Sequence, residues 1–332
     1  MRRVESLDHL RGLMAVSVML YHYRMWLLHE QSGLLGKLGI YAVATFYVLS
    51  GASLGMVYLE RLGTPREIAA FWIRRLFRIV PLFWLVTAAT LLVRGSRHDP
   101  LLNFSLLFSV FDPAGAIATG AWSIGNELVF YALLPLIALA PRAALAISVV
   151  PAAAYAGYLI SADASLAAQW PVYVQPLNNL FLFVGGVVIA SAPRVRHPLL
   201  IGLPAAVVFC LYPMTSQVQL ATGTGRLVMS AATLAVVLAV YQARPALGGW
   251  AAQGLGFLGQ SCYSIYLLHP IAFGMTQRLH ASGWQAFAAS TAITLGLSWI
   301  SYRRIERPMM ELGAMLSQRL GRGAPVGRSG TP

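Results

Sequence analysis

An arginine and a histidine share one stripe of the first hydrophobic segment, at Arg11 and His22. Eleven residues make roughly three turns of an α-helix, so both side chains lie on one face, about 16 Å apart along the axis. Ionisable groups are costly inside a bilayer and mark functional sites by default. A guanidinium can bind an anion, and an imidazole can act as a general base. The pair predicts a polar site that reaches across the membrane. The alternative for His22 is that it only forms a hydrogen bond to a neighbouring helix.

A second polar group opens the segment WSIGNELVFY, where Ser123, Asn126 and Glu127 begin a hydrophobic helix. Ser123 and Glu127 are four residues apart and face together. We expect Glu127 at the depth of His22, where a carboxylate could orient the histidine as in a catalytic triad without its serine. A helix-capping cluster is the alternative, although a cap does not require Asn126 and Glu127 to be buried together.

Three arginines, Arg74, Arg75 and Arg78, open the segment FWIRRLFRIVP. Guanidinium groups match phosphate oxygens in a bidentate geometry, so this cluster predicts a phosphate site at a membrane edge, with Arg11 in the same region. The alternative is a set of arginines that extend to the lipid headgroups and fix the topology.

Polar residues also interrupt the segment LGQSCYSIYLLHPI, which contains Ser264, Tyr266 and His269. His269 is expected in the outer half of its span, whereas Ser264 could simply bond to its own helix backbone. Near the C-terminus, Glu306 lies among arginines and is expected to form a local salt-bridge cluster.

Membrane helices must position these residues. Of the 332 residues, 58% are hydrophobic and 11% are charged, whereas soluble domains average about 25% charged. Apolar runs near 20 residues recur, which predicts an all-α polytopic bundle of about ten transmembrane helices.

The first run is too long for a signal peptide and is expected to be a retained span. The stretch Leu101–Phe111 is too short to cross and is expected to be re-entrant or interfacial. The expected spans are 9–28, 37–59, 71–93, 122–140, 143–160, 176–192, 198–213, 226–243, 254–276 and 284–303.

The net charge of +13 is carried mainly by loop arginines on the side of the two termini. The positive-inside rule therefore places both termini in the cytoplasm, and the basic charge is expected to attract anionic lipids. No nucleic-acid motif accompanies the basic residues, and no metal-ligand spacing is present. Cys210 and Cys262 are expected to be buried thiols rather than a disulfide. We expect a transmembrane domain at 5–310 and a basic, disordered tail at 311–332.

Together these segments resemble the acyltransferase-3 family of membrane acyltransferases, which O-acylate lipopolysaccharide, exopolysaccharide and Nod factors. The resemblance covers roughly residues 5 to 310, and its motifs occur in the family's order. The matching pieces are LDHLRGLMAVSVMLYHY with its Arg-x10-His spacing, FYVLSG, RRLFRIVP with its Arg-x-x-Arg, WSIGNELVFY, SIYLLHP and IERP. The family's longer WSLxxE-type sequence is here WSIGNE, which keeps the serine and the glutamate.

The resemblance implies a multi-pass enzyme of the bacterial inner membrane. It would move an acyl group, most commonly acetyl, from cytoplasmic acyl-CoA to a hydroxyl of a carbohydrate or glycolipid. His22 would be the base or a transient acyl carrier. Glu127 would orient the base or act as an acid. The remaining site residues would bind the donor and the acceptor. Donor binding is expected at Arg11, Arg75 and Arg78, and acceptor binding at Ser123, Asn126, Tyr266 and His269.

Two other functions fit the residues less well. A polytopic transporter or exporter also places polar residues at mid-depth, but transporters often contain repeated halves and this sequence shows none. An unrelated membrane O-acyltransferase that acts on protein or lipid would centre on an Asn/His pair in a different order. Consumption of acyl-CoA that depends on an acceptor separates the enzyme from the transporter.

Overall fold

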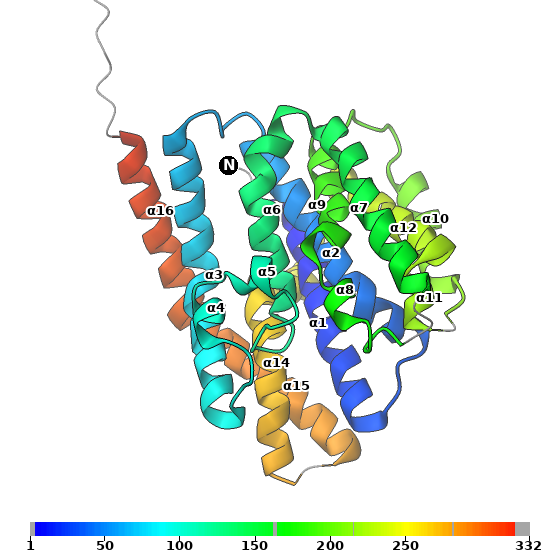
Figure 1. Ribbon diagram of the computed structural model, residues 1–332, viewed down its shortest axis with the longest axis vertical. Helices are drawn as coiled ribbons and strands as arrows, with labels where there is room; N and C mark the ends of the chain where they lie inside the picture. The colour runs from blue at the N-terminus through cyan, green and yellow to red at the C-terminus, as the bar shows by residue number, and fades with distance from the viewer. Residues whose placement is uncertain (1–3, 162–164, 215, 281, 323–332) are drawn as a thin grey trace, which may run out of the picture.

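The computed structural model describes residues 4–161, 165–214, 216–280 and 282–322. Every regular element in these ranges is helical, which confirms the predicted all-α class (Figure 1). The helices are α1 (Glu5–Leu28), α2 (Gly33–Tyr58), α3 (Pro65–Arg94), α4 (Pro100–Phe104), α5 (Phe108–Phe111), α6 (Trp122–Leu139), α7 (Pro141–Ser161), α8 (Trp170–Tyr173), α9 (Pro176–Ala190), α10 (Leu199–Leu211), α11 (Gln217–Ala221), α12 (Gly223–Ala243), α13 (Gly249–Gln260), α14 (Cys262–Arg278), α15 (Gly283–Ser301), the π-helix η1 (Tyr302–Glu306) and α16 (Arg307–Arg322).

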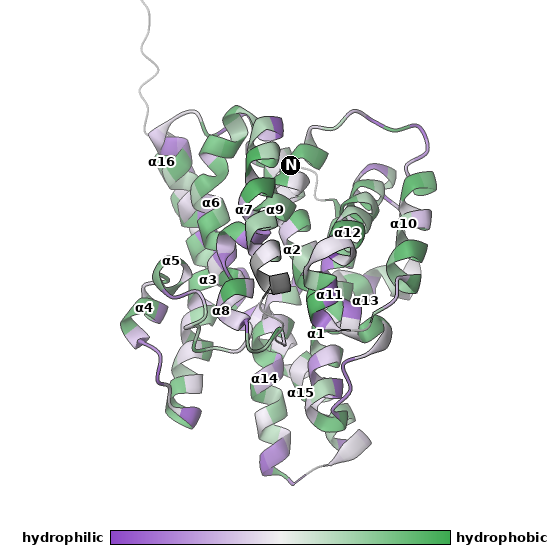
Figure 2. Cartoon of the chain, turned by 45° about the vertical axis from the view of Figure 1, so that its right-hand side comes forward, coloured by the Kyte–Doolittle hydropathy of each residue, from purple (hydrophilic) through white to green (hydrophobic). Residues whose placement is uncertain are grey.

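The protein is a multi-pass membrane protein. Five helical segments of the described chain are long and apolar enough to cross a bilayer, namely α2, α3, α6, α12 and the α8–α9 stretch Trp170–Ala190. Apolar residues dominate these helices, whereas hydrophilic residues gather mainly in the connecting loops and at the helix ends (Figure 2). Each of the ten expected spans coincides with a helix or a helix pair, and the number of crossings remains a prediction.

The expected span 254–276 is a pair of helices, α13 and α14, that meet at Ser261. A Cβ atom on Gly259 would lie 2.2 Å from the Asp8 carbonyl oxygen, so α13 packs directly on the backbone of α1. The chain then changes direction at Ser261 and continues as α14. Hydropathy alone gives no sign of this break, because both helices are apolar.

Helices α2 and α9 form the closest packing of the bundle centre. A Cβ atom on Gly51 would lie 1.9 Å from the Phe183 carbonyl oxygen, and one on Gly186 would lie 2.1 Å from that of Val48. Small residues let membrane helices approach until their backbones touch, which gains packing contacts where lipid offers no hydrophobic driving force. These two glycines therefore fix α2, which carries one wall of the site.

Helix α3 begins earlier than its expected limit of residue 71. Thr64 and Glu67 form a capping box, in which Glu67 N–H donates to Thr64 Oγ1 over 3.3 Å and Thr64 N–H donates to Glu67 Oε2 over 3.0 Å. The helix is 30 residues long. The early start places Arg75 almost three turns inside the helix, at about 3.6 residues per turn, instead of in its first turn.

The described ends of the chain lie at the same end of the bundle, the top of Figure 1, where α1 starts and α16 finishes. The turns after α1, α3 and α14 lie at the opposite end (Figure 1). A chain that crosses a membrane an even number of times has both of its ends on the same side. The cytoplasmic placement of the termini remains a prediction from the loop charges.

The stretch Leu101–Phe111 contains only the short helices α4 and α5 and does not cross the bundle. Asn103 is fully buried and ties this stretch to the loop that leads into α6. Its Nδ2 donates to the Gly115 carbonyl over 2.9 Å, and its Oδ1 accepts from Ile117 N–H over 2.9 Å. The segment therefore supports the N-terminus of α6.

Helix α16 continues from α15 through η1 and packs along α3. Arg74 Nε donates to Ser317 Oγ over 2.7 Å across this contact. The expected disordered tail at 311–332 is thus helical as far as Arg322. Its remaining part, 323–332, lies outside the described residues.

Candidate active site

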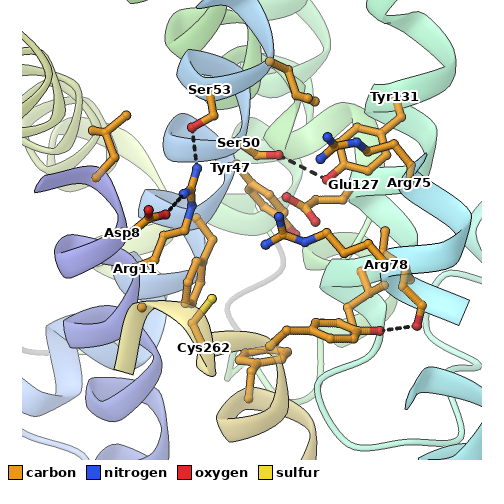
Figure 3. A pocket seen from close by; sticks show the side chains of 18 of the residues that line it. Asp8, Arg11, Tyr47, Ser50, Ser53, Arg75, Arg78, Glu127, Tyr131 and Cys262 are labelled. Atoms are coloured by element: carbon orange, nitrogen blue, oxygen red, sulfur yellow. Dashed lines mark hydrogen bonds and ion pairs between the residues drawn. The ribbon is translucent and has the colours of Figure 1, made fainter. Parts of the chain in front are cut away.

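A cavity of about 380 Å³ lies between α1, α2, α3, α6 and α14. Arg11 enters it from α1, Arg75 and Arg78 enter from α3, and Glu127 enters from α6 (Figure 3). The structure therefore brings together all three arginines that the sequence predicted for an anionic group. A volume of this size is within the range of about 300–1,000 Å³ that is usual for small-molecule sites.

Arg11 is held from two sides. Its Nη1 forms an ion pair with Asp8, which is one turn earlier on α1 and on the same face. Its Nη2 donates to Ser53 Oγ and, over 3.3 Å, to the Leu49 carbonyl of α2. These contacts fix the guanidinium at the cavity wall (Figure 3).

Arg75 is held by aromatic rings. Its Cζ lies 6.0 Å from the ring centroid of Tyr58, 5.8 Å from that of Phe71 and 6.0 Å from that of Tyr131. Its Nε is buried and has no hydrogen-bond partner among the described residues. Tyr131 Oη in turn lies 3.2 Å from Ser50 Oγ. The rings orient the guanidinium while leaving donors for a ligand.

Arg78 from α3 and Glu127 from α6 project into the same cavity (Figure 3). The Cys262 thiol also lines the cavity. Both cysteines are free thiols, but only Cys262 is buried, so the expected burial of Cys210 is wrong.

Ser123 and Tyr266 meet at the cavity wall. Ser123 Oγ lies 2.8 Å from Tyr266 Oη, and this phenol lies 2.9 Å from the Gly120 carbonyl. Ser123 and Glu127 both line the cavity, as their four-residue spacing predicted. Asn126 is fully buried outside the lining, where its Nδ2 donates to Tyr47 Oη over 3.2 Å.

His22 and His269 form a separate pair. His22 Nδ1 lies 2.8 Å from His269 Nε2, and the two rings are nearly parallel with centroids 5.0 Å apart. Trp26 stacks on His22 at 4.9 Å. The expected His22–Glu127 pair is therefore wrong, because the His22 ring packs against α14 whereas Glu127 faces the cavity. Tyr266 lines the cavity, and its ring lies 6.2 Å from the His269 ring, so the pair lies next to the cavity wall.

Glu306 does not belong to an exposed salt-bridge cluster, contrary to expectation. It is 3% exposed, lines the cavity and accepts a hydrogen bond from Ser264 Oγ. The wider π-helical turn of η1 directs it inward, away from the exposed Arg307. Glu306 follows the last expected span, and burial raises the pKa of its carboxyl to about 7.

Sequence reasoning missed Asp8, Ser53 and Tyr131, which hold the arginines. The spacing of Asp8 and Arg11, at i and i+3 on one helix, was a usable signal for the ion pair. Ser53 and Tyr131 gave no such signal, because their partners are on other helices.

The helical bundle is that of an integral membrane protein with a cavity lined by three arginines. The chain belongs to the acyltransferase-3 family, because the family's acyltransferase domain matches residues 4–303. It is therefore an acyltransferase.

Relatives of known name carry related functions. The chain is 27% identical to a protein of Komagataeibacter xylinus provisionally named membrane-bound transacylase BcsY, over 92% of this chain and 82% of that protein. It is 26% identical to the exopolysaccharide production protein ExoZ of Rhizobium meliloti, over 86% of this chain and 93% of that protein. A provisionally named O-acetyltransferase of Staphylococcus aureus is 29% identical over 41% of this chain, which covers 25% of that longer protein. No solved structure matches the chain.

Proposed function

We propose that this enzyme transfers an acetyl group from cytoplasmic acetyl-CoA to a hydroxyl of a cell-surface or secreted carbohydrate. The observation that carries the proposal is the convergence of Arg11, Arg75 and Arg78 in one cavity of an acyltransferase. The name of ExoZ, which concerns exopolysaccharide production, supports a carbohydrate acceptor. The enzyme would function in the bacterial inner membrane with both termini in the cytoplasm.

The arginines would bind the donor through its phosphates. CoA carries several phosphate charges, and charge-assisted bonds from arginine to phosphate are among the stronger hydrogen bonds in proteins. The free Nε of Arg75 is one donor for such a bond. The flexible pantetheine arm would extend from these phosphates past Tyr266 towards His22.

His22 would act as the general base. It would take the proton of the acceptor hydroxyl as the oxygen attacks the thioester carbonyl, and then return that proton to the departing CoA sulfur. Glu127 would act from the cavity, where it can orient the donor or an acceptor hydroxyl. Ser123 and Tyr266, at the junction between the cavity and the histidine pair, would contact the acceptor.

Purified protein in proteoliposomes tests the proposal. Acetyl-CoA is supplied on the side of the termini, and glycan from a deletion strain is supplied as acceptor. The expected result is release of free CoA only when acceptor is present, together with acetyl esters on the glycan in mass spectra. Uptake of glycan without CoA release would instead identify a transporter and overturn the proposal.

A further inference from the structure

We propose that His269 is a positioning residue that fixes the tautomer of His22, so that Nε2 of His22 is the basic atom. This inference rests on the proposed role of His22 as the base. It replaces the expected acceptor-binding role of His269 with a role that acts through another residue. The partner of the base is then a neutral imidazole in place of a carboxylate.

The hydrogen bond from the His269 ring to the backbone of α14 has only one possible direction. His269 Nδ1 lies 3.2 Å from the Ile265 carbonyl oxygen. A carbonyl can only accept a hydrogen bond, so His269 Nδ1 must carry the hydrogen.

His269 is completely buried, where a neutral imidazole is far less costly than a charged one. With its hydrogen on Nδ1, its Nε2 presents a lone pair to His22 Nδ1 at 2.8 Å. His22 Nδ1 must then donate, and neutral His22 holds its own lone pair on Nε2. The opposite tautomer of His22 would place two lone pairs against each other across this distance.

The surroundings hold both rings in place. His269 is completely buried, and the Trp26 ring lies within 5° of parallel to the ring of His22. Tyr23 Oη donates to the His269 carbonyl over 2.9 Å and lies 2.6 Å from Thr294 Oγ1, which links α1, α14 and α15. His22 therefore has little freedom to rotate away from His269.

A neutral partner suits this location. An ionised carboxylate buried among apolar side chains carries a large desolvation cost, whereas a neutral imidazole does not. During transfer the His22 Nε2 gains the hydroxyl proton as the ester C–O bond forms and loses it to sulfur as the C–S bond breaks. His269 accepts the Nδ1 hydrogen bond throughout and gains no net proton.

Two variants at residue 269 test the inference. His269→Gln keeps an amide oxygen at about the reach of Nε2, whereas His269→Leu removes the acceptor and keeps an apolar volume. We expect His269→Leu to lower the rate of glycan O-acetylation by at least about 10-fold, towards the roughly 10⁴-fold loss caused by a wrong histidine tautomer. His269→Gln should recover much of that rate, and both variants should bind acetyl-CoA as the unchanged protein does. Full activity of His269→Leu, or no recovery by His269→Gln, would overturn the inference.

Nitrogen-15 NMR of the full-length protein in lipid bilayers gives an independent readout. Histidine-labelled protein, with His22→Asn used for assignment, reports which ring nitrogen of His22 carries hydrogen. Hydrogen on Nδ1 is expected, and hydrogen on Nε2 alone overturns the inference even if both variants at residue 269 misfold. Absence of acetylation by the unchanged protein would overturn the proposed function and leave this spectroscopic result standing.

Discussion

The arginine-lined cavity and the histidine pair differ in how they hold polar groups inside the bundle. The cavity is lined by ionisable side chains, with Arg11 paired to Asp8 and with Arg78 and Glu127 both projecting into it. The pair contains two stacked imidazoles among aromatic rings, joined by one hydrogen bond. Under the proposed function, this difference corresponds to a division of labour, in which the arginines bind an anionic donor and a neutral base transfers the proton where charge is costly.

The largest effect expected from this division is on His22. His22→Ala should lower glycan acetylation by roughly 10²- to 10⁴-fold, the usual contribution of a general base, while acetyl-CoA binding is preserved. Acetate released from surface glycan and donor binding to purified protein measure the two effects. His29→Ala, an exposed residue just after α1, is the matched control. Unchanged acetylation by His22→Ala would contradict the role of His22 as the general base.

Loss of a cavity arginine should act on binding. Arg78→Ala should raise the KM for acetyl-CoA by roughly 10- to 100-fold, because a charged hydrogen bond contributes about 1.5–3 kcal/mol. Arg74→Ala is the matched control, since Arg74 is on the same helix but bonds to Ser317 of α16. Equal effects of the two substitutions would show that the arginines act through folding or topology.

The two free thiols report on occupancy of the cavity. Cys262 lines the cavity and Cys210 is exposed elsewhere on α10. Acetyl-CoA should slow maleimide labelling of Cys262 several-fold and leave labelling of Cys210 unchanged, as measured by mass spectrometry of each peptide. Equal labelling of Cys262 with and without donor would place the donor outside this cavity.

The smallest effect concerns pH. The pKa of Glu306 is raised to about 7, so its carboxyl is neutral below that pH and negative above it. A negative charge in the cavity repels an anionic donor, so affinity for acetyl-CoA should fall by roughly fivefold, about 1 kcal/mol, as the pH rises through 7. The affinity of Glu306→Gln should lack this step. A step of the same size in both proteins would assign it to the donor's own phosphates.

Helical periodicity predicted the cavity well and the histidine pair poorly. The spacing of Ser123 and Glu127, and of Arg75 and Arg78, is local to one helix, so their common orientation follows from 3.6 residues per turn. The contact between His22 and His269 depends on how α1 packs against α14, which local spacing does not encode.

The positions of the helices were also predictable from the sequence, whereas two breaks in their course were not. Apolar runs predicted where helices lie, because burial in lipid requires them. The break at Ser261 and the inward turn of Glu306 come from backbone packing of Gly259 and from the π-helical turn of η1. Neither feature changes the hydropathy of the segment, so neither was predictable from it.

The backbone contact of Gly51 and Gly186 has a consequence for redesign. Because the backbones of α2 and α9 already touch at these glycines, α2 cannot move closer to α9, and the wall that carries Ser50 and Ser53 cannot retreat to widen the cavity. A larger cavity would therefore come from shorter side chains on the other lining helices, α1, α3, α6 and α14. Directed evolution towards bulkier acyl donors should accumulate its substitutions on those helices and spare the two glycines.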